Sequence, residues 1–152
     1  MATRKDLGRP ADDRSRIDAL KLALRGRGLR ATPSRLAVLG LLRSNGGPLS
    51  HAEAADRLHD QSWDRATIYR NLTDLAEAGL ARRSDVGDHT WRFEAVDVAH
   101  ADDRHAHFVC TECGVVECMP DVGLAVGKAA PRAVRRKQVE VQVRGRCDGC
   151  AA

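Results

Sequence analysis

Two Cys-x-x-Cys pairs are the residues whose spacing predicts chemistry most clearly. Cys110 and Cys113 form the first pair, and Cys147 and Cys150 form the second. Each pair can direct two thiolates at a single point, and four thiolates make the closed tetrahedral site that structural Zn(II) prefers. A redox-active pair would belong to a βαβ unit, which the sequence does not indicate, and disulfides are rare in the cytosol. The spacing therefore predicts a structural zinc site that contributes folding free energy but performs no reaction.

Two histidines precede the first cysteine pair. His105 and His107 lie two residues apart in a segment with strand-like alternation, so both imidazoles should point to the same face. They could share one metal ion, or they could be polar residues on an exposed strand. These histidines mark a candidate second metal site.

The positive charge of the chain is concentrated near its N-terminus. The chain has a formal charge of +4 and a pI of about 9.0, and residues 1–35 hold ten Lys and Arg against four Asp. This distribution indicates an anionic partner. Aromatic residues make up only 3% of the chain, which argues against a surface that stacks single-stranded bases. A nucleic-acid partner would therefore be a duplex.

Hydropathy excludes a membrane protein at the level of the sequence. No apolar run approaches the roughly 18 residues that a membrane-spanning helix needs. Residues 1–13 are polar and lack the apolar segment of a signal peptide, so we expect a flexible tail there. The length of 152 residues allows one ordinary domain or two small ones. We expect a cytoplasmic protein without a membrane partner.

Helical periodicity dominates the first half of the chain and predicts four helices. The first should run over about residues 14–27, with Ile17, Leu20 and Leu24 on its apolar face. The second should begin at Pro33, with Thr32 as its N-cap, and end near residue 44. Ser50 and Glu53 form a capping box, which predicts a third helix that ends near residue 58.

The fourth predicted helix has an apolar face and a polar face. Asp64 should cap it and Gly79 should end it. Its apolar stripe consists of Ile68, Leu72, Leu75 and Ala76. The opposite face presents Arg65, Tyr69, Arg70 and Thr73. Residues 80–84 and 89–94 then predict a hairpin with a turn on Gly87, so this half reads as a winged helix-turn-helix.

Strand-like alternation dominates the second half. It predicts strands at about 107–109, 115–119 and 139–143. Residues 121–136 form a weak helical stretch, which contains Gly123, Gly127 and Pro131. Because proline interrupts a helix, Pro131 should restrict this helix to one side of itself.

At this point the chain resembles the ferric uptake regulator family of metal-dependent bacterial repressors. The matching stretches follow the family's order: 28–35 (GLRATPSR), 48–50 (PLS), 64–72 (DRATIYRNL), 78–80 (AGL), 105–114 (HAHFVCTECG) and 145–150 (GRCDGC). The resemblance implies an α+β fold with a winged-helix DNA-binding domain at 14–95. It also implies an α/β dimerisation domain at 96–152, which carries the four-cysteine zinc site. A homodimer would bind a pseudo-palindromic operator when a sensory metal is in place.

The resemblance also implies which residues contact DNA. Residues 64–72 look like the family's recognition helix, in which Tyr69 and Arg70 would be the principal contacts, beside Arg65 and Thr67. An Arg can bond guanine edges bidentately, and a Tyr can touch a thymine methyl or a phosphate. The alternative is a solvated helix face. Four basic residues are expected to contact phosphates: Arg14, Lys21, Arg30 and Arg35.

A second, regulatory divalent metal is implied by the resemblance. Its candidate ligands are Glu94, His105, His107 and Cys118, the last of which replaces the family's usual Asp or Glu. Nitrogen, oxygen and sulfur donors suit four-coordinate Zn(II) better than Fe(II) or Mn(II), so we expect a zinc-uptake repressor. An iron sensor, a peroxide sensor and a free thiol at Cys118 stay open. Residues that could complete the site are His51, His100, Asp102 and Asp103.

Two other classes of protein compete with a regulator. A zinc hydrolase could use His105, His107 and Glu94 as ligands with an open fourth position. No scaffold large enough for a catalytic pocket is indicated, and the helix-turn-helix would have no role, so we do not expect an enzyme. A zinc-ribbon interaction module would bind no duplex DNA.

Overall fold

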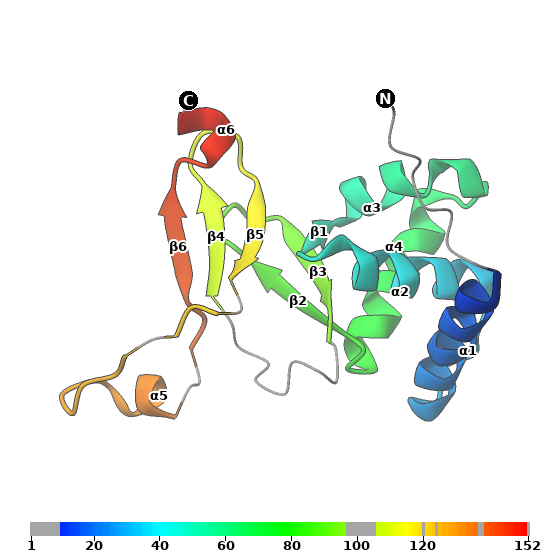
Figure 1. The fold of residues 1–152 in the computed structure, drawn as a ribbon, viewed down its shortest axis with the longest axis horizontal. Coiled ribbons are helices and arrows are strands. Elements are labelled where there is room, and N and C mark those ends of the chain that lie inside the picture. Colours follow the sequence, from blue (N-terminus) through cyan, green and yellow to red (C-terminus); the bar gives the residue numbers. More distant parts are fainter. Residues whose placement is uncertain (1–9, 97–105, 120, 124, 137–138, 152) are drawn as a thin grey trace.

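The computed structural model describes residues 10–96, 106–119, 121–123, 125–136 and 139–151. It has an α+β architecture in which helices cover one three-stranded sheet and a second three-stranded sheet follows (Figure 1). The helices are α1 Pro10–Gly26, α2 Pro33–Asn45, α3 His51–Arg57, the 3-10 turn η1 His59–Gln61, α4 Arg65–Glu77, α5 Arg132–Arg135 and α6 Asp148–Ala151. The strands are β1 Leu49–Ser50, β2 Ala81–Asp85, β3 Trp91–Ala95, β4 Ala106–Cys110, β5 Val116–Met119 and β6 Gln142–Gly145.

Three helices begin at the predicted caps. The Thr32 hydroxyl accepts a hydrogen bond from the Arg35 amide, and an Asp64 carboxylate oxygen accepts one from the Thr67 amide at 2.6 Å. Both reciprocal bonds of the Ser50 capping box are present. These caps satisfy amide donors that the first helical turn leaves without partners. The sequence therefore predicted the starts of α2, α3 and α4 correctly.

The first helix differs from its prediction in its N-terminal half. It begins at Pro10, four residues before the predicted start. Leu24 is fully buried and Leu20 is half-buried, but Ile17 is 45% exposed. The reason is that α1 packs mainly on α2, near its own C-terminal end, and extends away from the domain (Figure 1).

The core of the first domain lies between α2, α3, α4 and the sheet β1-β3-β2. Ile68, Leu72 and Leu75 of α4 are buried, as predicted, and Ala76 is half-buried. Phe93 of β3 is fully buried among them. This packing fixes α4 by its apolar stripe and leaves its opposite face open to solvent.

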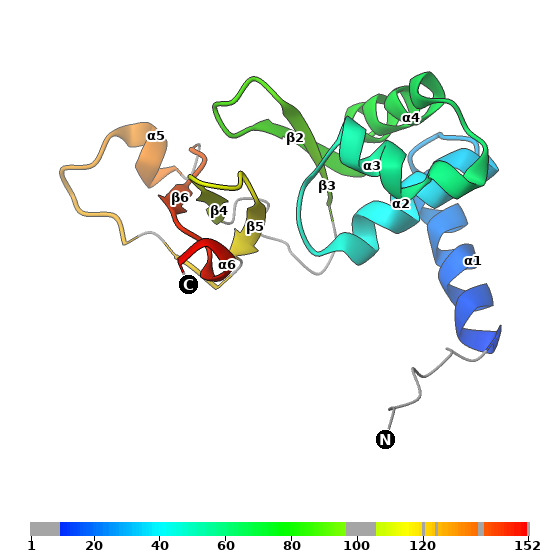
Figure 2. The same ribbon diagram turned by 90° about the horizontal axis from the view of Figure 1, so that it is seen from above.

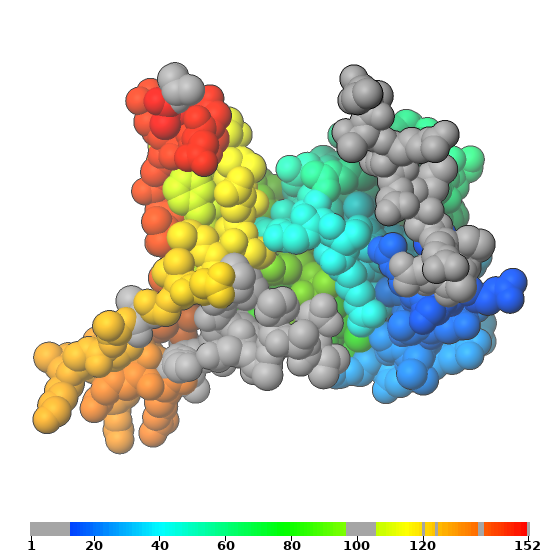
Figure 3. All heavy atoms as spheres, in the orientation of Figure 1, coloured from blue at the N-terminus to red at the C-terminus, as the bar shows by residue number. Residues whose placement is uncertain are grey.

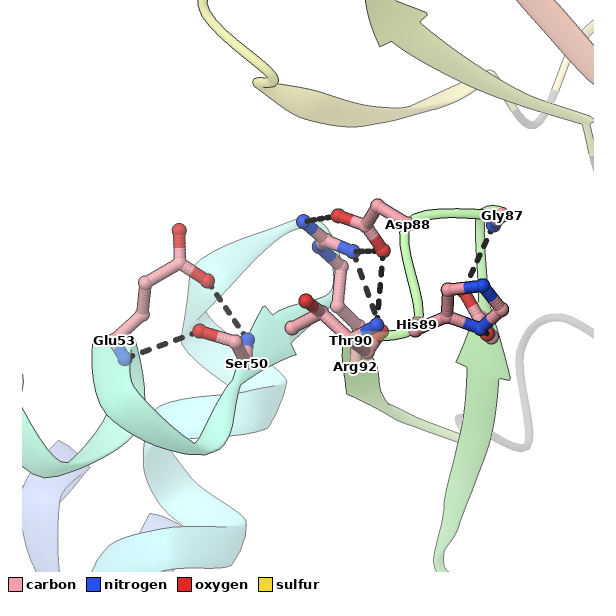
Figure 4. A network of polar contacts seen from close by, with 8 residues as sticks. Ser50, Glu53, Gly87, Asp88, His89, Thr90 and Arg92 are labelled. Carbon is pink, nitrogen blue, oxygen red and sulfur yellow. Dashed lines mark hydrogen bonds and ion pairs between the residues drawn. The ribbon is translucent and has the colours of Figure 1, made fainter.

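The predicted hairpin is present, and a third strand joins it. Strands β2 and β3 pair antiparallel, while β1 pairs with the other edge of β3 and was not predicted. Gly87 has a φ of +92°, which a residue with a side chain rarely adopts. Figure 4 shows Asp88 at this turn, paired with Arg92 of β3, close to the Ser50–Glu53 capping box at the start of α3. The β2–β3 hairpin therefore lies close to the N-terminal end of α3 at this point.

The C-terminal sheet has β4 in its centre. Strand β5 pairs with β4 antiparallel, and β6 pairs with β4 parallel. Strand β6 begins at Gln142, three residues after the predicted start, and it runs on to Gly145. The helix predicted over 121–136 is limited to α5, which begins directly after Pro131. This segment projects from the sheet as an arm (Figure 3).

Among the helices that the structure describes, none has the length and apolar character needed to cross a membrane.

Candidate functional site

The four cysteines converge at one end of the C-terminal sheet. Cys110 ends β4, Cys113 lies in the following turn, Cys147 follows β6 and Cys150 lies on α6. The four sulfur atoms all lie within 4.8 Å of one another. The parallel pairing of β4 with β6 places Cys110 opposite Gly145, which brings the second pair to the first. Four sulfurs at one point fit the tetrahedral site that Zn(II) prefers.

Backbone donors prepare part of this cluster for a cation. Amide groups of Cys113 and Cys147 point at the Cys110 sulfur and lower the pKa of that thiol to about 6. The Cys150 thiol makes hydrogen bonds with the other sulfurs, and these bonds raise its pKa to about 12. The bond with Cys147 has the largest effect. At neutral pH the Cys110 sulfur is therefore a thiolate, whereas the Cys150 thiol keeps its proton until a bound metal displaces it.

A second cluster joins the two sheets. It consists of Glu94 from β3, His107 from β4 and Cys118 from β5, whose ligand atoms lie within 4.8 Å of one another. Glu94 Oε2 is 3.1 Å from His107 Nε2, and the Cys118 thiol donates to Glu94 Oε1 at 2.5 Å. His107 and Cys118 face each other across the β4–β5 pair. An imidazole, a carboxylate and a thiol therefore meet where the first domain touches the second.

The second cluster is shielded from water. The side chains of His107 and Glu94 are 9% and 14% exposed. Burial, together with the Glu94 carboxylate, raises the pKa of the Cys118 thiol to about 12. The thiol thus keeps its proton at neutral pH until a cation displaces it, because metal binding requires the thiolate.

Not all predicted ligands belong to this cluster. His105 lies outside the described residues, as do His100, Asp102 and Asp103. In the described part of the chain, His51 is not a member of this cluster. Its Nε2 is 2.8 Å from the Arg65 carbonyl oxygen, and its ring contacts the Tyr69 ring edge-on. His51 therefore contacts α4 instead, which a reading of ligand types alone missed.

A contact between the domains beside Cys118 was also missed. Gly47, in the loop between α2 and β1, lies so close to β5 that a Cβ there would be 3.6 Å from the Val116 carbonyl oxygen and 3.9 Å from the Cys118 sulfur. No pattern in the local sequence predicts this tertiary contact between Gly47 and β5.

The open face of α4 carries the residues expected to contact DNA. Arg65, Tyr69 and Arg70 are exposed, and Thr67 is half-buried. Arg65 pairs with Asp56 at 2.8 Å, and Arg70 Nη2 lies 3.4 Å from the Thr67 hydroxyl. These side chains can therefore reach a partner outside the domain.

The four basic residues expected to contact phosphates are in different situations. Arg14 and Arg30 are exposed, and Lys21 pairs with Asp18 at 3.1 Å on the surface of α1. Arg35 is only 15% exposed, because its guanidinium bonds Asp74 of α4 and the Arg30 carbonyl. Its guanidinium thus joins α2 to α4, and a contact of Arg35 with a phosphate stays a prediction.

The order of these elements and clusters is that of a known family. The profile described as the ferric uptake regulator family matches residues 26–142. The chain belongs to this family. Ferric uptake regulation protein 1 of Mycolicibacterium fortuitum is 36% identical over 107 residues, which cover 70% of this chain and 62% of that protein. The chain thus spans slightly less than two thirds of the length of this relative.

Solved structures of ferric uptake regulator proteins share the fold. The Vibrio cholerae ferric uptake regulator superposes with a TM-score of 0.62 at 23% identity, covering 84% of this chain and 98% of that one. A zinc uptake regulator in complex with zinc and DNA gives a TM-score of 0.58 at 20% identity, with 94% and 97% covered. These similarities support the α+β architecture with an N-terminal winged helix.

Proposed function

We propose that this protein is a metal-responsive transcriptional regulator that binds duplex DNA as a homodimer in the cytoplasm. Proteins of this family are transcription regulators rather than enzymes. The observation that carries the proposal is the cluster of Glu94, His107 and Cys118, which takes one ligand from the winged-helix domain and two from the C-terminal sheet. An ion held there would fix how the two domains are placed.

Metal binding at this cluster would select one arrangement of the recognition helices. In a dimer, two such helices read half-sites about one helical turn of DNA apart. An ion that binds this arrangement better than others shifts the population toward it. The coupling must be reciprocal, so operator DNA should tighten metal binding by the same factor.

We propose Zn(II) as both the structural and the regulatory ion. Four thiolates suit structural Zn(II), and the sulfur of Cys118 favours Zn(II) at the second cluster. The relative complexed with zinc and DNA agrees with this choice. The relatives named ferric uptake regulation proteins keep Fe(II) as an alternative, and the solved structure of one with manganese keeps Mn(II). His105 stays a candidate fourth ligand.

The test is metal-dependent binding to a duplex selected from a random library. Fluorescence anisotropy should show tight binding in Zn(II), and a return to weak binding when a chelator removes the more accessible ion. Equal affinity with and without Zn(II), Fe(II) and Mn(II) would overturn metal regulation. Absence of binding to any duplex would favour an interaction module instead.

Arg70 should determine which sequence is bound. We expect Arg70→Ala to lower the ratio of operator to random-duplex affinity by about 5- to 150-fold, since a bidentate base contact contributes about 1–3 kcal/mol of discrimination. Lys21→Ala, a control on α1, should weaken both duplexes alike. Anisotropy on both duplexes measures the ratio. Equal weakening of both by Arg70→Ala would contradict a base contact.

A further inference from the structure

The arm between β5 and β6 carries positive charge that the fold does not use. From Asp121 to Arg136 the sequence has four Lys and Arg against one Asp. Three of the four are Arg132, Arg135 and Arg136, which lie on or directly after α5. Their spacing of three and four residues places them along one side of a helical turn.

These three arginines have no structural role in the described part of the chain. All three are exposed, and they border a shallow hollow of about 330 Å³. No carboxylate of the described residues pairs with them, although such pairs hold Arg35 and Arg92. Helix α5 buries no residue. Three like charges this close repel each other, so an anion bound among them would stabilise the arm.

The arm faces the same way as the recognition helix. In Figure 2, α5, the β2–β3 hairpin and α4 lie along one side of the molecule, while α6 lies on the opposite side of the C-terminal sheet. Helices α2 and α3 pack against α4, so that its open face is directed to this common side. A long polyanion on α4 and the wing would therefore extend toward α5.

We infer that Arg132, Arg135 and Arg136 form a phosphate-binding surface, the α5 surface, for the backbone of the duplex held by α4. This inference rests on the proposed function and extends it to a second DNA contact in the C-terminal domain. Arginine suits this contact because its planar guanidinium can bond two phosphate oxygens at once. Contacts to phosphates add affinity and fix the register without reading sequence.

The salt dependence of DNA binding tests the α5 surface directly. Each neutralised phosphate contributes about −0.9 to the slope of log K against log salt concentration. Because a homodimer carries each arginine twice, we expect the triple variant Arg132→Gln, Arg135→Gln, Arg136→Gln to reduce the magnitude of the slope by about 2 to 5 units, without changing the ratio of operator to random-duplex affinity. A matched control is Arg146→Gln, whose side chain pairs with Glu112 at 3.3 Å beside α6. It should leave the slope unchanged.

Three outcomes separate the alternatives. An unchanged slope in the triple variant, with wild-type protein binding the duplex, would overturn the α5 surface alone. Dissociation of the dimer in the variant, seen by sedimentation, would overturn it too, because the arginines would then bind a second copy of the chain. If wild-type protein bound no duplex, the α5 surface and the proposed function would both fail.

Discussion

Replacing Cys113 and Cys150 by serine is expected to remove one zinc ion per chain and to unfold the C-terminal sheet. In the described part of this domain only Ala106, Val109 and Cys110 are buried among apolar residues, so the sheet has little core of its own. Structural Zn(II) sites contribute on the order of 10–16 kcal/mol of apparent binding free energy, which here is folding free energy. Few other interactions in the domain could offset that loss.

Elemental analysis and thermal unfolding measure this result. The double variant should contain one ion fewer than wild type and lose the cooperative transition of the C-terminal domain, while the helices of the first domain persist in circular dichroism. Cys118→Ser is the matched control for the unfolding transition, which it should keep, because it removes a thiol of the same domain outside the four-cysteine cluster. Retention of the ion and of the transition by the double variant would exclude a structural zinc site.

Removing the ligands at the domain junction is expected to abolish the metal response but not the fold. His107→Ala and Cys118→Ser should each raise the Zn(II) concentration needed for tight operator binding by about 100-fold or more, since loss of even an outer-shell partner costs about 10–100-fold in metal affinity. Glu94, His107 and Cys118 offer only three ligands among the described residues. The loss of one would leave too few to hold an ion against water.

A third variant tests the choice of metal. Cys118→Asp keeps a negatively charged ligand but replaces its sulfur by oxygen. The metal that enhances operator binding should therefore shift from Zn(II) toward Mn(II) and Fe(II). Anisotropy titrations of each metal at fixed duplex concentration compare the three variants with wild type. A full Zn(II) response in His107→Ala would place the regulatory ion elsewhere. An unchanged metal preference in Cys118→Asp would mean that the sulfur does not decide selectivity.

Local signals were sufficient for much of the fold. Caps at Thr32, Ser50 and Asp64 located three helices, because capping depends on residues within one turn. The apolar stripe of α4 predicted which side of that helix is open. The spacing of the cysteines predicted that they would share one site, since each pair is already held together by a short turn.

Contacts between distant segments could not be predicted in this way. The pairing of Arg35 with Asp74, the edge-on contact of His51 with Tyr69 and the approach of Gly47 to β5 all depend on how the helices and sheets pack. The prediction of His51 as a possible metal ligand considered its chemistry and not its neighbours. Tertiary packing decided its position.

The parallel pairing of β4 with β6 has a consequence for the order of events on the ribosome. Cys113 and Cys147 are 34 residues apart, and β4 lacks one of its two neighbours until β6 has been translated. Domains generally fold as units, beginning with the N-terminal one during synthesis. The winged helix can therefore form on the nascent chain while the first cysteine pair still holds only half of its site. With the proposed zinc site, the supply of metal would then set the moment at which a new chain completes its C-terminal sheet.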